Sequence, residues 1–419
     1  MGGDRITALG GARAMSTFDG LWTAIADVGR DGTTGGYRRP VWGDAEQTLR
    51  EWFVGCAQER GLAVETDRNG NLWAWWLPPG WTGDPRGALV TGSHLDSVPD
   101  GGAFDGPLGV VSSFAAVDAL RAEGHVPQRP LGIVAFADEE GARFGVACVG
   151  SQLSTGALGP DRALGLRDAD GRSLAEVLTA AGRDPAALGR DPRLAERVGL
   201  FVELHVEQGR ALDRLGAPVA VASSIWPHGR WRLDFTGEAN HAGATLIADR
   251  HDPMLPYAAT VGSARQRAVQ HGAVATFGKV SVAPNGANAI ASGVHAVLDA
   301  RAPSTAVLEA LTADLFADAA RHAAAEGTSV AVHTESVSPV VEFPSGPRGR
   351  IRAVLGDIPM LPTAAGHDAG VLSAVVPTAM VFVRNPTGVS HSPAEWAERR
   401  DCLAGVDALT AVLRDGTTA

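Results

Sequence analysis

The stretch ALVTGSHLD, residues 88–96, decides the fold. Its apolar start predicts a short strand, which ends in a glycine, a serine and a histidine. Residues 110–120 have the pattern of a helix, and Gly124 behind them is a stop signal. A second apolar run, at residues 132–137, leads directly into Asp-Glu-Glu. Strands that alternate with helices in this way predict an α/β domain.

Two more apolar runs have the same character. Residues 201–206 predict a strand that contains His205, and residues 378–383 predict a strand that leads into Arg384 and Asn385. Every one of these strands carries charged, amide or imidazole side chains at its C-terminal end. Ligand crevices of open α/β sheets form at that edge, so we expect the functional site there.

The middle of the chain has a different order of predicted strands and helices. In order, it predicts a strand at 230–237, a helix at 253–270, strands at 274–282 and 294–300, a helix with Leu308, Leu311, Leu315 and Ala319 on one stripe, and a strand at 329–333. The order β-α-β-β-α-β is that of the ferredoxin-like split motif. We therefore expect a domain at 215–337, inserted in a larger α/β domain made of 1–214 and 338–419.

Composition excludes several classes of protein. The chain has 419 residues, 45% of them hydrophobic and 20% charged, which is typical of a globular protein and not of a disordered or fibrous one. A net charge of −11 without a Lys/Arg block argues against nucleic acid or an anionic membrane as a partner. Three scattered cysteines, no signal-peptide pattern and no long apolar stretch lead us to expect a reduced, cytoplasmic setting.

The densest group of candidate functional residues is at 92–106. His94 ends a strand, Asp96 follows two residues later, and Asp105 lies in a glycine-rich loop. Imidazole and carboxylate are the zinc-type ligands available without thiolates, and Asp96 is placed to orient the His94 ring from behind. Taken alone, the same residues could also form a surface pair beside a turn.

Three acids in a row, Asp138, Glu139 and Glu140, follow the strand at 132–137. Neighbouring carboxylates repel each other unless cations neutralise them. They are either a solvated loop or a site in which one glutamate binds a metal and its neighbour acts as a general base.

Two further histidines complete the set. His205 lies among apolar neighbours and could be a core residue, although the flanking acids would then also need partners. His391 precedes Ser392, Pro393 and Glu395, which fit the N-cap, N1 and N3 positions of a helix. Together, His94, Asp105, Glu140, His205 and His391 are about the number of ligands that two close metals need when one carboxylate bridges them.

At this point the chain resembles a known family. Residues 92–109, 136–145, 203–209, 240–245 and 391–395 are similar to the M20 metallopeptidase/amidohydrolase family, in the branch of N-carbamoyl-L-amino-acid hydrolases, allantoate amidohydrolases and β-ureidopropionases. The set His-x-Asp, Gly-Gly-x-x-Asp-Gly, Glu-Glu-Gly and Glu-Leu-His-x-Glu-Gln-Gly carries the resemblance, and Gly366-His367-Asp368-Ala369 favours this branch.

The resemblance implies a two-metal catalytic α/β domain with an inserted dimerisation and lid domain. His94 and either His391 or His205 would bind separate metals, Asp105 would bridge them, and Glu140 would bind one. Glu139 would be the general base and His241 would donate to the oxyanion. The residues that would contact substrate are Gln208, His241, Asn288, Arg301, Gly366 and His367, and of these Arg301 and Asn288 would hold the substrate carboxylate.

Three segments depart from the family pattern without loss of a candidate ligand. Residues 241–247 read HAGATLI instead of HAGTTPM, residues 285–291 lack the usual proline, and residues 137–140 read ADEE without a third glutamate. These departures bear on the substrate and leave the expected metal site intact.

We expect a hydrolase that converts an N-carbamoyl-L-amino acid to amino acid, ammonia and carbon dioxide. Allantoate, or an N-acyl amino acid or peptide, is the alternative substrate, and a silent binding protein with the same fold is the non-enzyme alternative. The expected cofactors are two divalent metal ions per subunit, zinc in first place, with manganese, cobalt or nickel possible. The expected assembly is a homodimer, with His241 reaching the active site of the other subunit.

Overall fold

The computed structural model describes residues 17–418. Contacts divide these residues into two compact units. The first unit comprises residues 17–223, 343–361 and 366–418, and the second comprises residues 224–342 and 362–365. Among residues 17–418, no helix is both long and apolar enough to cross a membrane.

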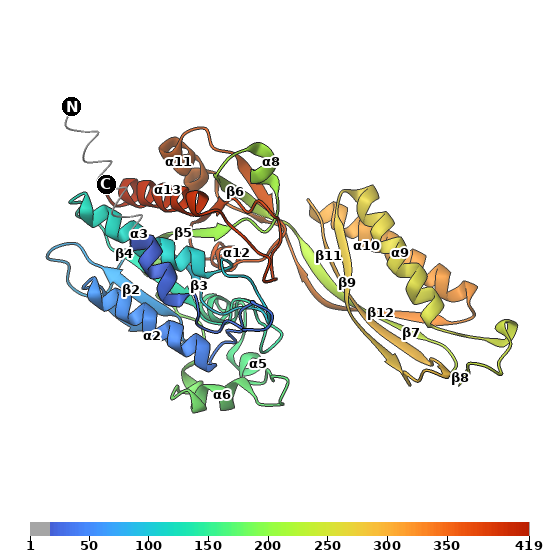
Figure 1. Cartoon of the computed structure of the whole chain (residues 1–419). Helices are drawn as coiled ribbons and strands as arrows, with labels where there is room; N and C mark the ends of the chain where they lie inside the picture. The colour runs from blue at the N-terminus through green and yellow to red at the C-terminus, as the bar shows by residue number, and fades with distance from the viewer. Residues whose placement is uncertain (1–16, 419) are drawn as a thin grey trace. The chain divides into compact units, whose positions relative to one another are not determined.

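A nine-stranded sheet with the order β1-β2-β4-β3-β5-β15-β6-β13 organises the first unit, and β14 also pairs with β6 (Figure 1). Its four central strands are parallel to one another: β4 (Leu131–Phe136), β3 (Ala88–His94), β5 (Val198–Val206) and β15 (Thr378–Val383). The flanking strands are β1 (Ala63–Thr66), β2 (Leu72–Trp76), β6 (Val219–Ile225), β13 (Val341–Glu342) and β14 (Met360–Thr363). The predicted α/β class is confirmed.

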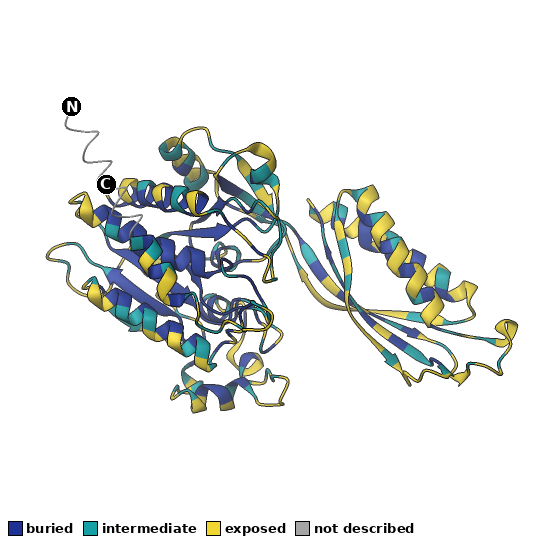
Figure 2. Ribbon diagram, in the orientation of Figure 1, coloured by how far each residue is buried: buried dark blue, intermediate teal, exposed yellow. Residues whose placement is uncertain are grey.

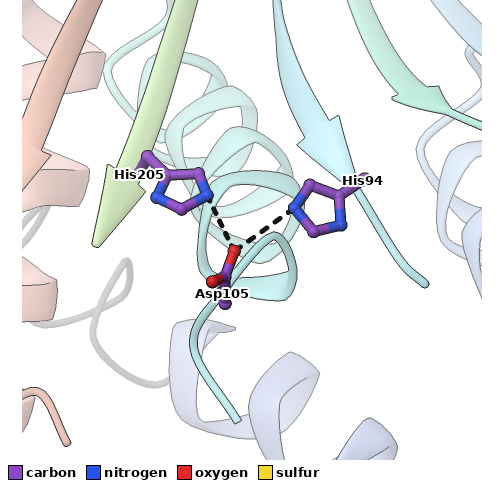
Figure 3. A group of neighbouring side chains, drawn as sticks. All are labelled: His94, Asp105 and His205. Atoms are coloured by element: carbon purple, nitrogen blue, oxygen red, sulfur yellow. Dashed lines mark ion pairs between the residues drawn. The ribbon is translucent and has the colours of Figure 1, made fainter. Parts of the chain in front are cut away.

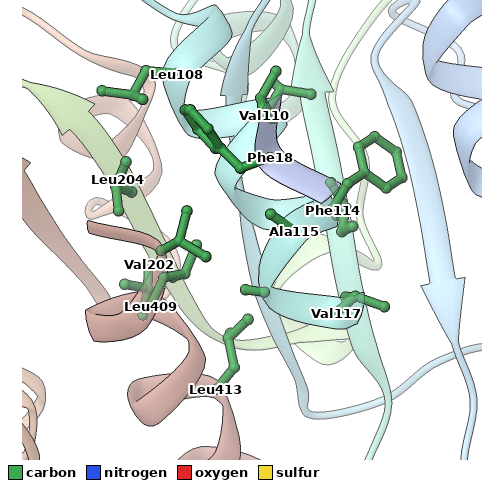
Figure 4. Packing of buried hydrophobic residues seen from close by; sticks show 14 of the residues in the cluster. Phe18, Leu108, Val110, Phe114, Ala115, Val117, Val202, Leu204, Leu409 and Leu413 are labelled. Atoms are coloured by element: carbon green, nitrogen blue, oxygen red, sulfur yellow. The ribbon is translucent and has the colours of Figure 1, made fainter. Parts of the chain in front are cut away.

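The main core lies between this sheet and the helices α2 (Asp44–Glu59), α3 (Pro107–Ala122) and α13 (Arg399–Thr418), and the helical segment at residues 17–25 adds Phe18, Leu21 and Ile25 to it. Helix α3 is apolar on nearly all sides, because it contacts β3, β4 and β5 on one side and α13 on another. Figure 4 shows Phe114 of α3 and Leu204 of β5 within this core, and Figure 2 shows that the central strands are mostly buried. Burial of apolar surface at this scale is the main force that holds the unit together.

Alternate side chains of β5 belong to the opposite face of the sheet. Val202, Leu204 and Val206 are in the main core, whereas Glu203 contacts the backbone of Ala369 in α12 (Asp368–Leu372). A separate apolar cluster holds α4 (Val149–Thr155), α5 (Pro160–Leu164) and α6 (Leu174–Ala180). This unit also contains a helical segment at residues 17–25, the helices α7 (Leu194–Arg197), α8 (Ala211–Leu215) and α11 (Ser345–Leu355), and the 3₁₀ turn η1 (Pro185–Ala187). A second 3₁₀ turn, η2 (Ile247–Asp249), belongs to the second unit.

The second unit has the predicted element order: β7 (His228–Thr236), α9 (Met254–His271), β9 (Val274–Ala283), β11 (Gly293–Arg301), α10 (Thr305–Ala325) and β12 (Ser329–Ser338). Its antiparallel sheet has the order β12-β7-β11-β9, as a ferredoxin-like motif requires. The stripe of Leu308, Leu311, Leu315 and Ala319 is fully buried against Trp231, Leu233, Phe235 and Leu298. The inserted α+β motif is confirmed.

One feature of this unit was not predicted. Strands β7 and β11 pair with each other, and beyond them the short strands β8 (Asn240–His241) and β10 (Ala289–Ile290) continue the same pairing. We call these four strands the ribbon. Two residues per strand are too few to produce a pattern of alternation that the sequence alone could reveal.

Candidate metal centre and active site

The candidate ligands meet at the C-terminal ends of the parallel strands. His94 ends β3, Glu140 follows β4, His205 is the penultimate residue of β5, and His391 follows β15. Asp105 comes from the loop that leads into α3. The strand order brings β4, β3, β5 and β15 together, so side chains that are distant in the sequence share one edge of the sheet.

Close approach of α3 to β3 depends on Gly106. Its backbone has φ 85°, a left-handed conformation that favours glycine. A Cβ atom at this position would lie 2.4 Å from Cε1 of the His94 ring. Glycine therefore allows the loop that carries Asp105 to fold directly against the histidine.

One ligand group consists of His94, Asp105 and His205 (Figure 3). Oδ1 of Asp105 lies 3.4 Å from Nε2 of His94 and 3.1 Å from Nε2 of His205. All three side chains are buried. The carboxylate oxygen and two imidazole nitrogens face a common point, as the ligands of one metal ion do.

The second ligand group shares Asp105 and adds Glu140 and His391. Nε2 of His391 lies 3.4 Å from Oδ2 of Asp105 and 3.4 Å from Oε2 of Glu140. His391 has φ 55° and a half-exposed side chain. Each oxygen of Asp105 therefore faces one group. His94 and His205 belong to the same group and His391 to the other, and which histidines bind the same metal stays a prediction.

Glu139 lies beside the first group, with Oε2 3.6 Å from Nε2 of His94. Its other oxygen, Oε1, accepts a contact of 3.5 Å from the Cys148 thiol. Asp96 holds the backbone of this segment, because its carboxylate accepts hydrogen bonds from the N–H groups of Glu139 and Glu140 at 3.2 and 3.1 Å. One carboxylate oxygen of Glu139 is thus turned toward the candidate ligands.

The two imidazoles of the first group are oriented from behind. Nδ1 of His94 lies 3.1 Å from the backbone oxygen of Asp96, and Nδ1 of His205 lies 2.8 Å from that of Val206. Donation from Nδ1 leaves the Nε2 lone pair free to bind a metal. Both Nε2 atoms are buried and lack a hydrogen-bond partner among residues 17–418. A divalent cation fits these orphaned atoms. Orientation of His94 by the Asp96 side chain, whose Oδ1 is 3.6 Å away, stays a prediction.

Charge density in the site also favours cations. Burial, with Asp105 as a like charge, raises the pKa of Glu140 to about 7. Burial likewise raises the pKa of Glu139 well above its usual value, although the nearby His94 opposes the shift. A hydrogen bond with Asp105 raises the pKa of His391 to about 9, against the effect of burial. Bound cations would stabilise these carboxylates in their charged forms.

Among the expected substrate residues of the first unit, Gln208 and His367 lie at the ligand groups. Nε2 of Gln208 donates to Oδ2 of Asp105 at 2.8 Å. The His367 ring is buried 4.4 Å from the His205 ring, and neither of its nitrogens has a hydrogen-bond partner among the described residues. Burial and the adjacent His205 hold the pKa of His367 well below its usual value, which favours the neutral imidazole. Gly366 is exposed just before α12.

The other expected residues belong to the second unit. Nδ1 of His241 accepts hydrogen bonds from the N–H groups of Gly243 and Ala244, both at 3.0 Å. The His241 ring is thereby fixed with Nε2 turned away from this turn. Asn288 directly precedes β10, whose Ala289 pairs with His241.

Arg301 lies at the opposite end of the same ribbon, where it pairs with His228. Its guanidinium donates to both carboxylate oxygens of Asp299 and to the backbone oxygen of Ala364. At about 3.3 Å per residue, the thirteen positions from Asn288 to Arg301 span about 40 Å. By this ideal-strand estimate the two residues lie at opposite ends of the ribbon, so the expectation that Arg301 and Asn288 hold one substrate carboxylate together does not fit a single chain.

The prediction of a helix with Ser392 as its N-cap is wrong. Residues 392–398 form a turn and an extended segment, and α13 begins only at Arg399. The capping interaction expected of Glu395 does not form, because its carboxylate instead accepts hydrogen bonds from the N–H groups of Phe104 and Asp105. Glu395 is a residue of the site that the sequence interpretation assigned to a local role, since its partners are about 290 positions away.

Comparisons with known proteins agree with this geometry. The sequence profile of peptidase family M20/M25/M40 matches residues 90–415. The chain belongs to this family. It is 37% identical to an N-carbamoyl-L-amino acid amidohydrolase of Geobacillus stearothermophilus, over 93% of this chain and 96% of that protein. It is 30% identical to an allantoate amidohydrolase of Escherichia coli strain K12, over 89% and 90% of the two chains.

Among solved structures, the chain is similar to an amidase of the hydantoinase/carbamoylase family from Burkholderia vietnamiensis. The TM-score is 0.86 at 30% identity, over 97% of this chain and 98% of that one. The predictions of the family and of an amidohydrolase are confirmed. M20 enzymes bind divalent metals, and the two groups that share Asp105 are candidate positions for them in this chain. A third possible group among the described residues, Glu203, His205 and His367, shares His205 with the first.

Proposed function

We propose that this chain is an N-carbamoyl-L-amino acid amidohydrolase with two divalent metal ions. The observation that carries the proposal is the pair of ligand groups that share Asp105, with Glu139 beside them. The Geobacillus relative, similar over nearly the whole length of both chains, supports this substrate class. The E. coli relative makes allantoate the second candidate, which also presents a ureido group beside a carboxylate.

His94, Asp105 and His205 would hold one ion, and Asp105, Glu140 and His391 the other. Imidazole and carboxylate donors suit zinc first and also accept manganese, cobalt or nickel. Such ions lower the pKa of a shared water and polarise the carbonyl that it attacks. The chain's own part is to orient Nε2 of His94 and His205 through the contacts of their Nδ1 atoms with backbone oxygens, and to hold Asp105 between the groups.

Glu139 would act as the general base. Its Oε2 faces the ligand group and would accept the proton of the attacking water, then return it to the nitrogen that leaves as the C–N bond breaks. Cys148 and the backbone contacts of Asp96 limit the movement of this carboxylate. Gln208, Gly366 and His367 would line the pocket, with the neutral His367 imidazole free to contact substrate.

The second unit would complete the site as a lid and dimerisation domain. In this proposal the catalytic domain comprises residues 1–214 and 338–419, and the lid and dimerisation domain comprises residues 215–337. Arg301 would bind the substrate carboxylate, and Asn288 and His241 would contact the substrate, with His241 also donating to the oxyanion. Since the ribbon separates Arg301 from Asn288 and His241 by about 40 Å, one substrate can contact all three only if two chains contribute. This supports a homodimer with shared active sites.

The surface of the second unit supports the same assembly. β9 is an edge strand, and large apolar side chains are exposed on it and on the neighbouring α9: Leu255, Val261, Val269, Val274 and Val280. Free edges and exposed apolar patches usually mark an interface. A second copy of this chain, aligned along β9 and α9, would cover both.

The test is release of ammonia from a panel of substrates by the metal-loaded enzyme. We expect N-carbamoyl-L-amino acids to be hydrolysed faster than allantoate, N-acetyl amino acids or dipeptides. Faster hydrolysis of allantoate would favour the second candidate, and no hydrolysis of any substrate would contradict the proposal in favour of a binding protein. Chelation should abolish activity, and Asp105→Ala should lose both metals because both groups share this residue.

A cytoplasmic setting stays a prediction. All three cysteines are buried and unpaired, so the fold of the described residues contains no disulfide.

A further inference from the structure

Glu395 connects two loops of the metal centre. Its side chain is buried, with 3% of its surface exposed. Oε1 accepts hydrogen bonds from the N–H of Phe104 at 2.8 Å and from the N–H of Asp105 at 3.0 Å. Oε2 accepts from the hydroxyl of Ser390 at 3.2 Å. A single carboxylate thus binds the backbone of the shared ligand Asp105 and the residue next to His391.

The Asp105 loop is shaped to receive this carboxylate. A Cβ atom at Gly102 would lie 2.3 Å from Oε1 of Glu395, so glycine leaves the space that the carboxylate fills. The Phe104 ring packs edge-on against Trp396, with ring centroids 5.9 Å apart. The segment at 395–396 therefore holds the loop at residues 102–105 through both hydrogen bonds and ring packing.

Ser390 extends the connection to the carboxylate of Asp105. Its hydroxyl lies 3.2 Å from Oδ2 of Asp105, the oxygen that faces His391 and Glu140. Gln208 donates to the same oxygen and to the Ser390 hydroxyl. Backbone and side chain of Asp105 are thus both fixed by groups that do not belong to either ligand set.

We propose that Glu395 is a positioning residue that sets the orientation of Asp105 for both metal ions. A bridging carboxylate must present each oxygen to a different ion, so a small rotation would weaken both sites at once. Groups that orient metal ligands in this way commonly change metal affinity by about 10–100-fold. The inference rests on the metal centre of the proposed function, but it concerns metal affinity and not the substrate.

The experiment measures the affinity of the full-length, metal-stripped protein for Co²⁺ and Zn²⁺ by competition with a chelator. Co²⁺ absorption reports the coordination of each equivalent. Glu395→Ala should weaken both equivalents by about 10–100-fold. Glu395→Gln keeps an oxygen that can accept from Phe104 and Asp105, so its affinities should remain within about threefold of wild type and its Co²⁺ spectrum unchanged. Glu51→Ala, at an exposed glutamate of α2, is the matched control.

Gly102→Ala is a second test that leaves Glu395 in place. Its methyl group would displace the carboxylate from the loop, and we expect the same loss of affinity. This variant decides the question if Glu395→Ala does not fold. Wild-type affinity for both ions in Glu395→Ala or in Gly102→Ala would overturn the proposal, as would equal losses in Glu395→Gln and Glu395→Ala.

The two proposals fail in distinguishable ways. If wild type binds two ions but hydrolyses no N-carbamoyl-L-amino acid, the substrate assignment fails and the role of Glu395 is still measured. If wild type binds no divalent ion, the metal centre itself is wrong. If wild type binds two ions and the variants do so equally well, only the role of Glu395 is wrong.

Discussion

Mixing two inactive variants tests whether each active site draws on two chains. Glu139→Gln removes the proposed base, which belongs to the first unit. His241→Ala removes the imidazole at the far end of the ribbon in the second unit. Neither variant should be active alone, because every site of each homodimer lacks one of the two groups. A hybrid dimer differs, since the two defects then fall in the same site and the other site is intact.

The expected recovery follows from the ribbon and from random exchange of subunits. The distance of about 40 Å between Arg301 and the Asn288–His241 end prevents one chain from supplying both ends to one substrate. When equal amounts of two variants exchange, half of the dimers are hybrids, and each hybrid has one competent site out of two. We therefore expect the mixture to regain about one quarter of the wild-type activity.

Choice of the partner variant identifies which end of the ribbon crosses to the other subunit. If the His241 end crosses and Arg301 serves its own chain, Arg301→Gln mixed with His241→Ala should also recover about one quarter of the activity. Arg301→Gln mixed with Glu139→Gln should recover none, because both defects then affect sites of their own chains.

The assay is initial-rate release of ammonia after incubation of the mixed proteins. Exchange of subunits is checked independently with one variant that carries a mass label, by native mass spectrometry. Complete exchange without recovery in the Glu139→Gln and His241→Ala mixture would refute the shared site. Recovery in both mixtures that contain Arg301→Gln, with none in the Glu139→Gln and His241→Ala mixture, would show that the opposite end of the ribbon crosses.

Three other predictions concern single variants or pH. Glu139→Gln should lower kcat by about 10²–10⁴ with metal content unchanged, whereas Glu140→Gln should lose metal; metal analysis showing the reverse would exchange their roles. The metal affinity of the group that contains His391 should rise about tenfold per pH unit from pH 7 to 9 and then level off. The reason is that His391, with a pKa of about 9, must lose a proton before it can bind a metal. A metal affinity that does not change with pH in this range would contradict the prediction. Phe114→Ala should lower the free energy of unfolding of the first unit by about 3–5 kcal/mol, measured by urea unfolding, because the ring is fully buried against Phe53 and Trp52. A decrease of less than about 1 kcal/mol would contradict this prediction.

Much of the site could be predicted because chemistry and strand ends coincide in the sequence. His94, Glu140 and His205 each lie at or just after an apolar run, and a parallel sheet brings such ends to one edge whatever the details of packing. The ferredoxin-like insertion was predictable for a similar reason, since its helices have one apolar stripe and its long strands alternate. These are local patterns that depend only on which side of an element is buried.

Contacts between distant segments could not be derived in the same way. Which histidines lie in the same candidate ligand group depended on the strand order β4-β3-β5-β15 and on the loop that directs the two oxygens of Asp105 to different groups. The sequence Ser-Pro-Ala-Glu at 392–395 matches a helix start, yet Glu395 binds the backbone of a loop about 290 residues away. Either a local helix cap or a long-range hydrogen bond could satisfy the Glu395 carboxylate, and only tertiary packing selects between the two.

The sequence by itself determined the types of the chemical groups, the two kinds of domain and the edge of the sheet at which function lies, because these follow from composition and periodicity along one segment. Tertiary structure alone decided how the ligands divide into two groups around Asp105, that Glu395 supports the loop that carries it, and that Arg301 and Asn288 lie at opposite ends of one ribbon. The physical reason is that hydrogen bonds and coordination act over about 3 Å, and which residues come that close is set by the folding of the whole chain.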